Sequence, residues 1–176
     1  QAYNGYPENL RRFIAEIRAK KALPILATPI ARNVWTEQNG KLTYNDLLHD
    51  HAQACIALGK ELNVPVLDLH QAAMDEIIRL GRDASKIYYH QGDWTHTNDY
   101  GAVRAAGYAA DELRSLGEAF PDYLPLIQTV SASSEPWKPE AALLLEKPAR
   151  LAGVKDPNGT EAVSYTHLTL PTKRIV

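Results

Sequence analysis

The chain has 176 residues, and its 19 lysines and arginines against 21 aspartates and glutamates give a formal net charge of −2. This balance and the absence of long basic runs argue against nucleic acid or an anionic membrane surface as a partner. No stretch approaches the length of a membrane span, and the single cysteine, Cys55, cannot form an internal disulfide. One domain of ordinary size is the expectation for this length.

Helices and short apolar runs alternate over the first two thirds of the sequence. Apolar residues at helical spacing predict helices at 7–20, 43–62, 70–80 and 99–116. The runs 23–28 and 64–69 lack polar alternation, which is typical of strands that are buried on both faces. This order predicts an α/β fold with a parallel sheet, helices on its faces and right-handed crossovers. The core positions that the helical pattern predicts include Leu10, Phe13, Ile14, Ile17, Leu47, Leu48, Ala52, Cys55, Leu58, Leu62, Ala73, Met74, Ile77 and Ile78.

Three segments are predicted to be irregular, and one of them, the loop 82–98, carries the main chemical signal described below. Residues 32–41 are polar and contain the turn signal Asn39-Gly40, so we expect a loop after the first strand, with Thr43 or Asn45 capping the next helix. Loops at this edge of a parallel sheet bind ligands, which makes Arg32 and Trp35 candidate contacts, with an ordinary loop as the alternative. Residues 121–162 begin rich in proline and serine, which indicates a linker or the start of a further module.

The main chemical signal lies between His90 and Ala102, just before the last predicted helix. Asp93 and His96 are three residues apart, and Asn98 is a candidate N-cap for that helix. A carboxylate placed to hold an imidazole is the acid/base half of a nucleophilic triad. No nucleophile that would complete such a triad is recognisable in the 176 residues.

The block from Gly92 to Ala102 resembles the last conserved block of the SGNH/GDSL hydrolases, which is Asp-x-x-His followed by a polar run and Gly-Ala. It is most similar to the rhamnogalacturonan acetylesterase-like branch, and residues 9–14, 24–29 and 64–69 resemble the segments expected upstream of it. The resemblance covers residues 7–117. It implies a flavodoxin-like, three-layer α/β/α fold with about five parallel strands, of which residues 1–120 are the C-terminal part.

The resemblance also implies an activity, which is a serine esterase that uses a Ser-His-Asp triad and no metal or other cofactor. His96 would be the general base and Asp93 its orienting carboxylate, while Trp94, His90 and Arg32 are candidate substrate contacts. The blocks that hold the serine and the oxyanion-hole glycine and asparagine have no match here, so we expect the fragment alone to be inactive. The implied substrate is an acetylated plant polysaccharide or oligosaccharide, from rhamnogalacturonan or pectin, and the implied location is secreted or periplasmic.

Several alternatives stay open at the level of sequence. Asp93 and His96 could form only a structural hydrogen bond, or they could join His90 in a metal site, although the spacing matches no standard signature. The aromatic side chains Trp94, Tyr88 and Tyr89 could stack on a sugar or simply pack, and His90 could be an ordinary loop residue. The whole protein could instead be an acyl esterase or acyltransferase for another carbohydrate or small ester, or a non-catalytic carbohydrate-binding relative.

The sequence of the last 14 residues predicts that they have a different origin from the rest of the chain. Residues 163–172 read Val-Ser-Tyr-Thr-His-Leu-Thr-Leu-Pro-Thr, which matches the translation of one frame of a transposase-type sequencing adapter. We therefore expect residues 163–176 to be an adapter-derived artefact and the chain to be a fragment of a gene assembled from environmental DNA.

Overall fold

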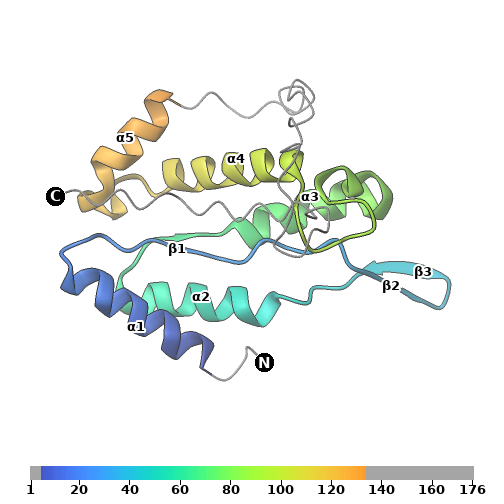
Figure 1. The fold of residues 1–176 in the computed structure, drawn as a ribbon, viewed down its shortest axis with the longest axis horizontal. Coiled ribbons are helices and arrows are strands. Elements are labelled where there is room, and N and C mark those ends of the chain that lie inside the picture. The colour runs from blue at the N-terminus through green and yellow to red at the C-terminus, as the bar shows by residue number, and fades with distance from the viewer. Residues whose placement is uncertain (1–4, 134–176) are drawn as a thin grey trace, which may run out of the picture. The chain divides into compact units, whose positions relative to one another are not determined.

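The computed structural model describes residues 5–133. In this part of the chain, helices and short strands alternate as the sequence predicts (Figure 1). The helices are α1 (Tyr6–Ala19), α2 (His49–Leu62), α3 (Leu69–Ala84), α4 (Asp99–Ser115) and α5 (Leu124–Ser133), and the 3-10 turns are η1 (Ser85–Tyr88), η2 (Gly117–Ala119) and η3 (Pro121–Tyr123). The strands are β1 (Leu26–Ala27), β2 (Trp35–Gln38), β3 (Lys41–Tyr44) and β4 (Val66–Leu67).

Strands β1 and β4 form a parallel pair with Leu26 opposite Val66 and Ala27 opposite Leu67. The pairing continues by one bond at the carboxyl end, where the Thr28 amide donates to the Leu67 carbonyl at 3.0 Å. Helices α1 and α2 lie on one side of this pair, and α3 and α4 lie on the other (Figure 1). The predicted mixed α/β architecture with parallel strands is thus confirmed, although each strand is shorter than its apolar run.

Apolar side chains gather in two clusters, one on each side of the strand pair. The first joins Ile14, Leu26, Cys55, Leu58 and Val64, and the second joins Ala31, Ala73, Ile77, Tyr89 and Tyr108. Each cluster removes apolar surface from water and so stabilises the packing of the helices on its side. Gly59 permits the close approach of α2, because a Cβ there would lie 2.1 Å from a methyl group of Val66.

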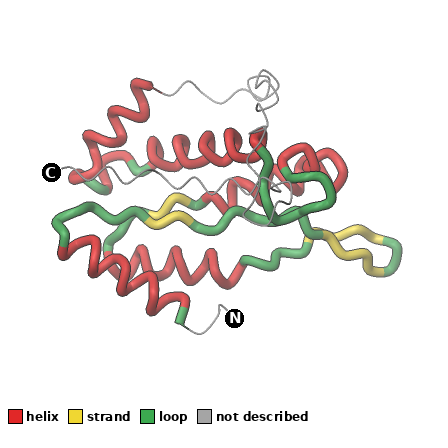
Figure 2. The backbone as a smooth tube through the Cα atoms, in the orientation of Figure 1, coloured by secondary structure: helices red, strands yellow, loops and turns green. Residues whose placement is uncertain are grey.

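Residues 35–44 differ from the prediction of a loop followed by a helix from residue 43. They form an antiparallel hairpin, β2–β3, that pairs Trp35 with Tyr44 (Figure 2). Asn39 and Gly40 both have positive φ, 52° and 72°, which suits the two-residue turn of a hairpin. Helix α2 consequently begins only at His49, with no side-chain cap, and Leu47, predicted to be buried, is 49% exposed.

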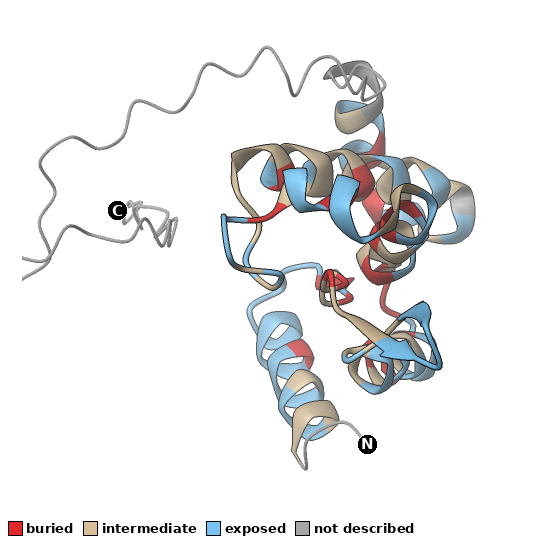
Figure 3. Cartoon of the chain, turned by 90° about the vertical axis from the view of Figure 1, so that its right-hand side faces the viewer, coloured by how far each residue is buried: buried red, intermediate tan, exposed pale blue. Residues whose placement is uncertain are grey.

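Part of the predicted helical core is open to solvent. Only Ile14 of the α1 stripe is buried, whereas Phe13 and Ile17 are exposed, so the helix beside the N-terminus is mostly pale blue in Figure 3. On α3, Ile78 is exposed where the pattern predicted burial, and Glu76 is buried instead. Helical periodicity locates the apolar stripe correctly but does not say how much of it finds a partner.

Residues 121–133 are ordered here as η3 and α5, where the proline and serine content indicated a linker. Helix α5 packs on α4, and the buried Tyr123 hydroxyl donates to the Pro24 carbonyl at 2.7 Å. The remainder of the predicted linker, 134–162, and the predicted artefact, 163–176, lie outside the described residues. Within residues 5–133, none of the helices is long and apolar enough to cross a membrane.

Candidate active site

The loop that carries Asp93 and His96 lies between η1 and α4 and is closed on itself. Tyr89 and Thr97 form an antiparallel bridge at its base. Inside the loop the His90 amide donates to the His96 carbonyl at 3.2 Å, and the Asp93 amide donates to the His90 carbonyl at 3.0 Å. These main-chain bonds hold residues 90–96 as a compact turn, which gives its side chains a defined direction.

Asp93 and His96 meet within this turn. The Nδ1 atom of His96 lies 2.7 Å from Oδ2 of Asp93, and Oδ1 of Asp93 accepts hydrogen bonds from the amides of Thr95, at 2.7 Å, and His96, at 3.1 Å. The Thr95 amide, the His96 ring and the His96 amide together lower the pKa of Asp93 to about 2. Asp93 is therefore ionised at neutral pH and can only accept, so Nδ1 of His96 carries the proton in this contact.

The turn is fixed to the start of α4 by Asn98, the predicted N-cap. Its side-chain oxygen accepts from the Gly101 amide at 3.0 Å, and its Nδ2 donates to the carbonyls of Ile87 and Tyr89 at 2.8 and 2.9 Å. Gly101 allows this closeness, because a Cβ there would lie 2.2 Å from the Tyr88 carbonyl oxygen. The N-cap prediction is confirmed, and the same side chain also ties the loop to the preceding turn.

The other predicted contacts are distributed around the pair. Trp94 is 52% exposed and His90 is also exposed, so both are accessible beside His96. The backbone beside Arg32 lies against this loop, because the amide of its neighbour Asn33 donates to the Trp94 carbonyl at 2.9 Å. The Nε of Arg32 is buried and has no hydrogen-bond partner within the described residues.

Two aromatic candidates are used in packing. Tyr89 is 4% exposed and its hydroxyl donates to the Ala31 carbonyl at 2.8 Å. Trp35 is partly buried, donates from Nε1 to Oδ1 of Asn33 at 2.6 Å and meets Tyr44 edge to face. Among residues 5–133, no three His, Cys, Asp or Glu side chains are grouped so that they could hold a metal ion.

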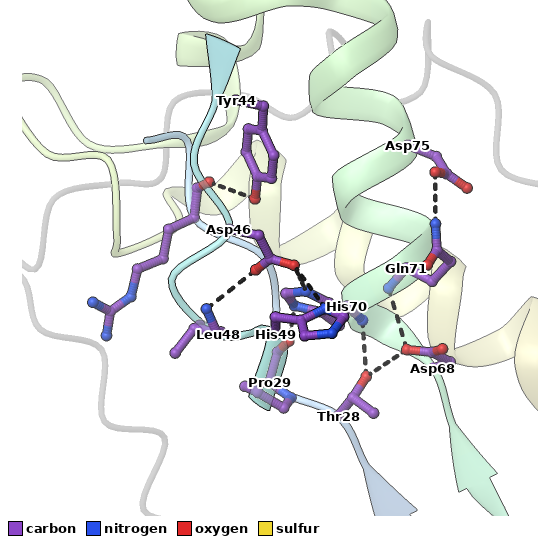
Figure 4. Close-up of polar contacts among 11 residues, drawn as sticks. Thr28, Pro29, Tyr44, Asp46, Leu48, His49, Asp68, His70, Gln71 and Asp75 are labelled. Atoms are coloured by element: carbon purple, nitrogen blue, oxygen red, sulfur yellow. Dashed lines mark hydrogen bonds and ion pairs between the residues drawn. The ribbon is translucent and has the colours of Figure 1, made fainter. Parts of the chain in front are cut away.

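A second aspartate–histidine pair, which sequence reasoning missed, lies at the carboxyl ends of β1 and β4 (Figure 4). His70, buried at the start of α3, places Nδ1 3.2 Å from the Pro29 carbonyl and Nε2 3.0 Å from Oδ2 of Asp46. The Thr28 hydroxyl accepts from the His70 amide at 2.8 Å and donates to Asp68, the N-cap of α3, at 3.0 Å. Asp46 is 24 residues from His70, so no local motif signals this contact.

Glu76 is a further buried acid that the sequence pattern did not single out. Its Oε1 accepts from the Tyr88 hydroxyl at 2.8 Å, and its Oε2 accepts from Nε of Arg104 at 2.5 Å and from the Tyr108 hydroxyl. Burial alone would raise the pKa of Glu76, but these donors outweigh it and the pKa is lowered; burial and Glu76 raise that of Tyr88 to about 12. The network joins α3 to α4 beneath the loop, and all of its members are partnered, which indicates a structural role.

Comparison with known proteins finds two relatives with a named activity. No family model matches the chain. It is 30% identical over 137 residues to the probable rhamnogalacturonan acetylesterase YesY of Bacillus subtilis, in a match that covers 74% of this chain and 57% of the relative. It is also 30% identical over 135 residues to the rhamnogalacturonan acetylesterase RhgT of the same organism, covering 69% of this chain and 57% of the relative.

One solved structure also resembles the chain. The crystal structure of the protein YxiM of Bacillus subtilis matches with a TM-score of 0.53 and 28% identity, over 63% of this chain and 31% of that one. The chain spans only about 57% of the length of the curated relatives that it matches. It is a distant homologue of the Bacillus rhamnogalacturonan acetylesterases, in the SGNH hydrolase branch.

Proposed function

We propose that the chain supplies the acid/base half of a serine esterase that removes acetyl groups from a plant polysaccharide, rhamnogalacturonan or pectin. The observation that carries this proposal is the 2.7 Å contact between Nδ1 of His96 and the carboxylate of Asp93, in a loop whose His96 side chain is 57% exposed. An oriented and accessible imidazole is what a triad requires of its base.

In the proposed reaction, Nε2 of His96 takes the proton of a serine hydroxyl as the serine oxygen bonds to the acetyl carbonyl carbon. When the tetrahedral intermediate collapses, the bond from this carbon to the sugar oxygen breaks, and the imidazolium gives its proton to that oxygen. Water then hydrolyses the acetyl-serine with the same proton transfers, releasing acetate. Asp93 keeps the proton on Nδ1 of His96 and stabilises the imidazolium.

We place the serine and the oxyanion-hole donors in a part of the longer protein that precedes residue 1. In that protein, β1 would be flanked by further parallel strands of a flavodoxin-like sheet, and secretion or export to the periplasm would bring it to its substrate. Loss of a triad nucleophile typically costs about 10⁶-fold in rate, and one oxyanion donor about 10²–10³-fold. We therefore expect the 176-residue chain alone to release no measurable acetate.

The substrate is supported by the activity for which the two relatives are named and by the surroundings of the pair. Trp94 offers an exposed indole face on which a sugar ring could stack, and Arg32, next in the chain to the residue that bonds the Trp94 carbonyl, would offer a cation to the substrate. An acidic, acetylated sugar chain suits both of these features. A neutral acetylated polysaccharide would use the indole but gain nothing from the arginine.

The test is acetate release from acetylated rhamnogalacturonan by a longer protein that contains this chain. We expect His96→Ala to lower kcat by about 10⁴-fold or more, while the matched change His49→Ala, at a histidine that is also exposed, leaves it unchanged. Equal activity of His96→Ala and the parent would contradict the proposal. Release from acetylated xylan but not pectin would favour the esterase for another carbohydrate, and polysaccharide binding without any release would favour the non-catalytic relative.

A further inference from the structure

Asn33 is a buried side chain that connects three separate segments, and the proposed reaction does not use it directly. It is 5% exposed. Its Nδ2 donates to the Arg82 carbonyl near the end of α3 at 3.0 Å, and its Oδ1 accepts from Nε1 of Trp35 in β2 at 2.6 Å. Its main-chain amide donates to the Trp94 carbonyl at 2.9 Å.

The bond to Trp94 acts on one particular peptide unit. The carbonyl of Trp94 and the amide of Thr95 belong to the same planar peptide group. At the carbonyl end this group accepts from Asn33, and at the amide end it donates to Oδ1 of Asp93 at 2.7 Å. Fixing the carbonyl therefore fixes the direction of the amide, and polarising the carbonyl strengthens the amide as a donor.

The side chain of Asn33 determines where its own amide lies. Every residue except proline offers a main-chain donor, so the bond to Trp94 does not by itself require asparagine. The two side-chain bonds do, because one group must donate to a carbonyl while also accepting from an indole. An aspartate would lack the donor, and an aliphatic residue would lack both the donor and the acceptor, although the Arg82 carbonyl would still accept from the Ser85 hydroxyl at 3.2 Å.

We propose that Asn33 is the positioning residue of the Asp93–His96 pair. It holds the Trp94–Thr95 peptide so that the Thr95 amide donates to the Asp93 carboxylate, which in turn orients His96. The catalytic consequence rests on the proposed esterase function, whereas the effect on the carboxylate does not. Asn33 has no role in the proton transfers proposed above, and its hydrogen bonds go to Arg82, Trp35 and Trp94. It acts through the peptide.

The test measures the pKa of Asp93 by carboxyl NMR titration in the full chain, with circular dichroism to confirm that each variant is folded. In Asn33→Ala we expect the pKa to rise from about 2 by about one pH unit towards 3.8, because the best-placed donor is no longer held. Trp35→Phe, which removes the indole donor to Asn33 but keeps an aromatic ring beside Tyr44, is expected to move the pKa in the same direction by a smaller amount.

The matched control is Tyr89→Phe. It removes another buried bond between the same two segments, the 2.8 Å contact from the Tyr89 hydroxyl to the Ala31 carbonyl, without touching the Trp94–Thr95 peptide. We expect the pKa of Asp93 to stay unchanged in this variant. A rise as large as that in Asn33→Ala would mean that any loosening of the region is enough, and would overturn the proposal.

Two further outcomes decide the matter. If Asn33→Ala is folded and the pKa of Asp93 does not move, the proposal is wrong; if Asn33→Ala does not fold, an unmoved pKa in Trp35→Phe overturns it. In a longer, active protein, a lowered kcat with unchanged KM in Trp35→Phe would extend the effect to catalysis. If that protein proves to have no esterase activity, the titration of Asp93 still tests the positioning.

Discussion

Asp93–His96 and Asp46–His70, two aspartate–histidine pairs in the described part of the chain, differ in reach, exposure and hydrogen-bond partners. Asp46 also lies 3.5 Å from Nδ1 of the exposed His49. Asp93 and His96 are three residues apart in one turn, and their side chains are 34% and 57% exposed. Asp46 and His70 come from different segments, and their side chains are 20% and 4% exposed. The first pair faces solvent, whereas the second lies at the ends of the parallel strands.

The hydrogen-bond partners of the two histidines indicate different roles, a structural one for His70 and a catalytic one for His96 in the proposed reaction. Nδ1 of His70 must donate to the Pro29 carbonyl, so the contact between Nε2 and Asp46 needs a second proton, on the ring or on the carboxyl. Both nitrogens of His70 are thus committed to internal partners. In His96 the carboxylate engages Nδ1, and Nε2 is the nitrogen that would carry out proton transfer in the proposed reaction.

The largest effect that would sharpen this comparison is on turnover. In a longer protein that holds the nucleophile, we expect Asp93→Asn to lower kcat by about 10⁴-fold, because an amide can hold His96 in the wrong tautomer. The matched change Asp46→Asn should leave kcat within about threefold, since its amide can donate to Nε2 of His70 and its oxygen can still accept from the Leu48 amide. A loss of turnover in Asp46→Asn as large as that in Asp93→Asn would break the comparison.

The next effect is on stability, where we expect the buried pair, and not the exposed pair, to show the larger loss on substitution. His70→Ala removes two buried hydrogen bonds and leaves a cavity, so we expect the free energy of unfolding to fall by about 3 kcal/mol. His96→Ala should change it by less than about 0.5 kcal/mol, because the side chain is largely exposed. Urea denaturation of both variants, with equal m-values, measures the contrast, and comparable losses of stability would show that His96 is also a structural residue.

The smallest effect is the titration of Asp93 itself. The pKa of about 2 in the folded chain lies below the 3.8 of an unperturbed aspartate, so its contacts stabilise the folded state above pH 3.8 and this contribution is lost as the pH falls through about 2. In His96→Ala the pKa should rise but remain below 3.8, because the Thr95 amide still donates. Carboxyl NMR gives both midpoints, and a value near 3.8 in the parent chain would rule out the described turn.

The local features of the site could be predicted from sequence because their determinants are close together in the chain. Asp-x-x-His before a helix, with Asn98 as its cap, is readable in a single stretch. The hairpin at 35–44 had a readable signal in Asn39-Gly40 between strand-forming residues, which we assigned to a simple loop. The helical spacing of apolar residues in 43–48 predicts a helix there, and this prediction is wrong because residues 41–44 form a strand and α2 begins at His49.

The long-range features had no such signal. His70 meets Asp46 only because the chain between them returns through β4, and Asn33 meets Trp94 only when the segment after β1 lies against the loop. Burial of Glu76 within an apolar stripe also depends on three donors from elsewhere in the chain. Pairwise contacts set by tertiary structure cannot be inferred from periodicity or spacing.

The most direct test of the account is the position of the proton on the neutral imidazole of His96, read from long-range ¹⁵N NMR couplings in the full chain. We predict that the proton resides on Nδ1, held by Asp93, and that Asp93→Asn shifts the population towards Nε2. A neutral His96 that is protonated on Nε2 in the parent chain would contradict the account, because that tautomer cannot accept a proton from a serine.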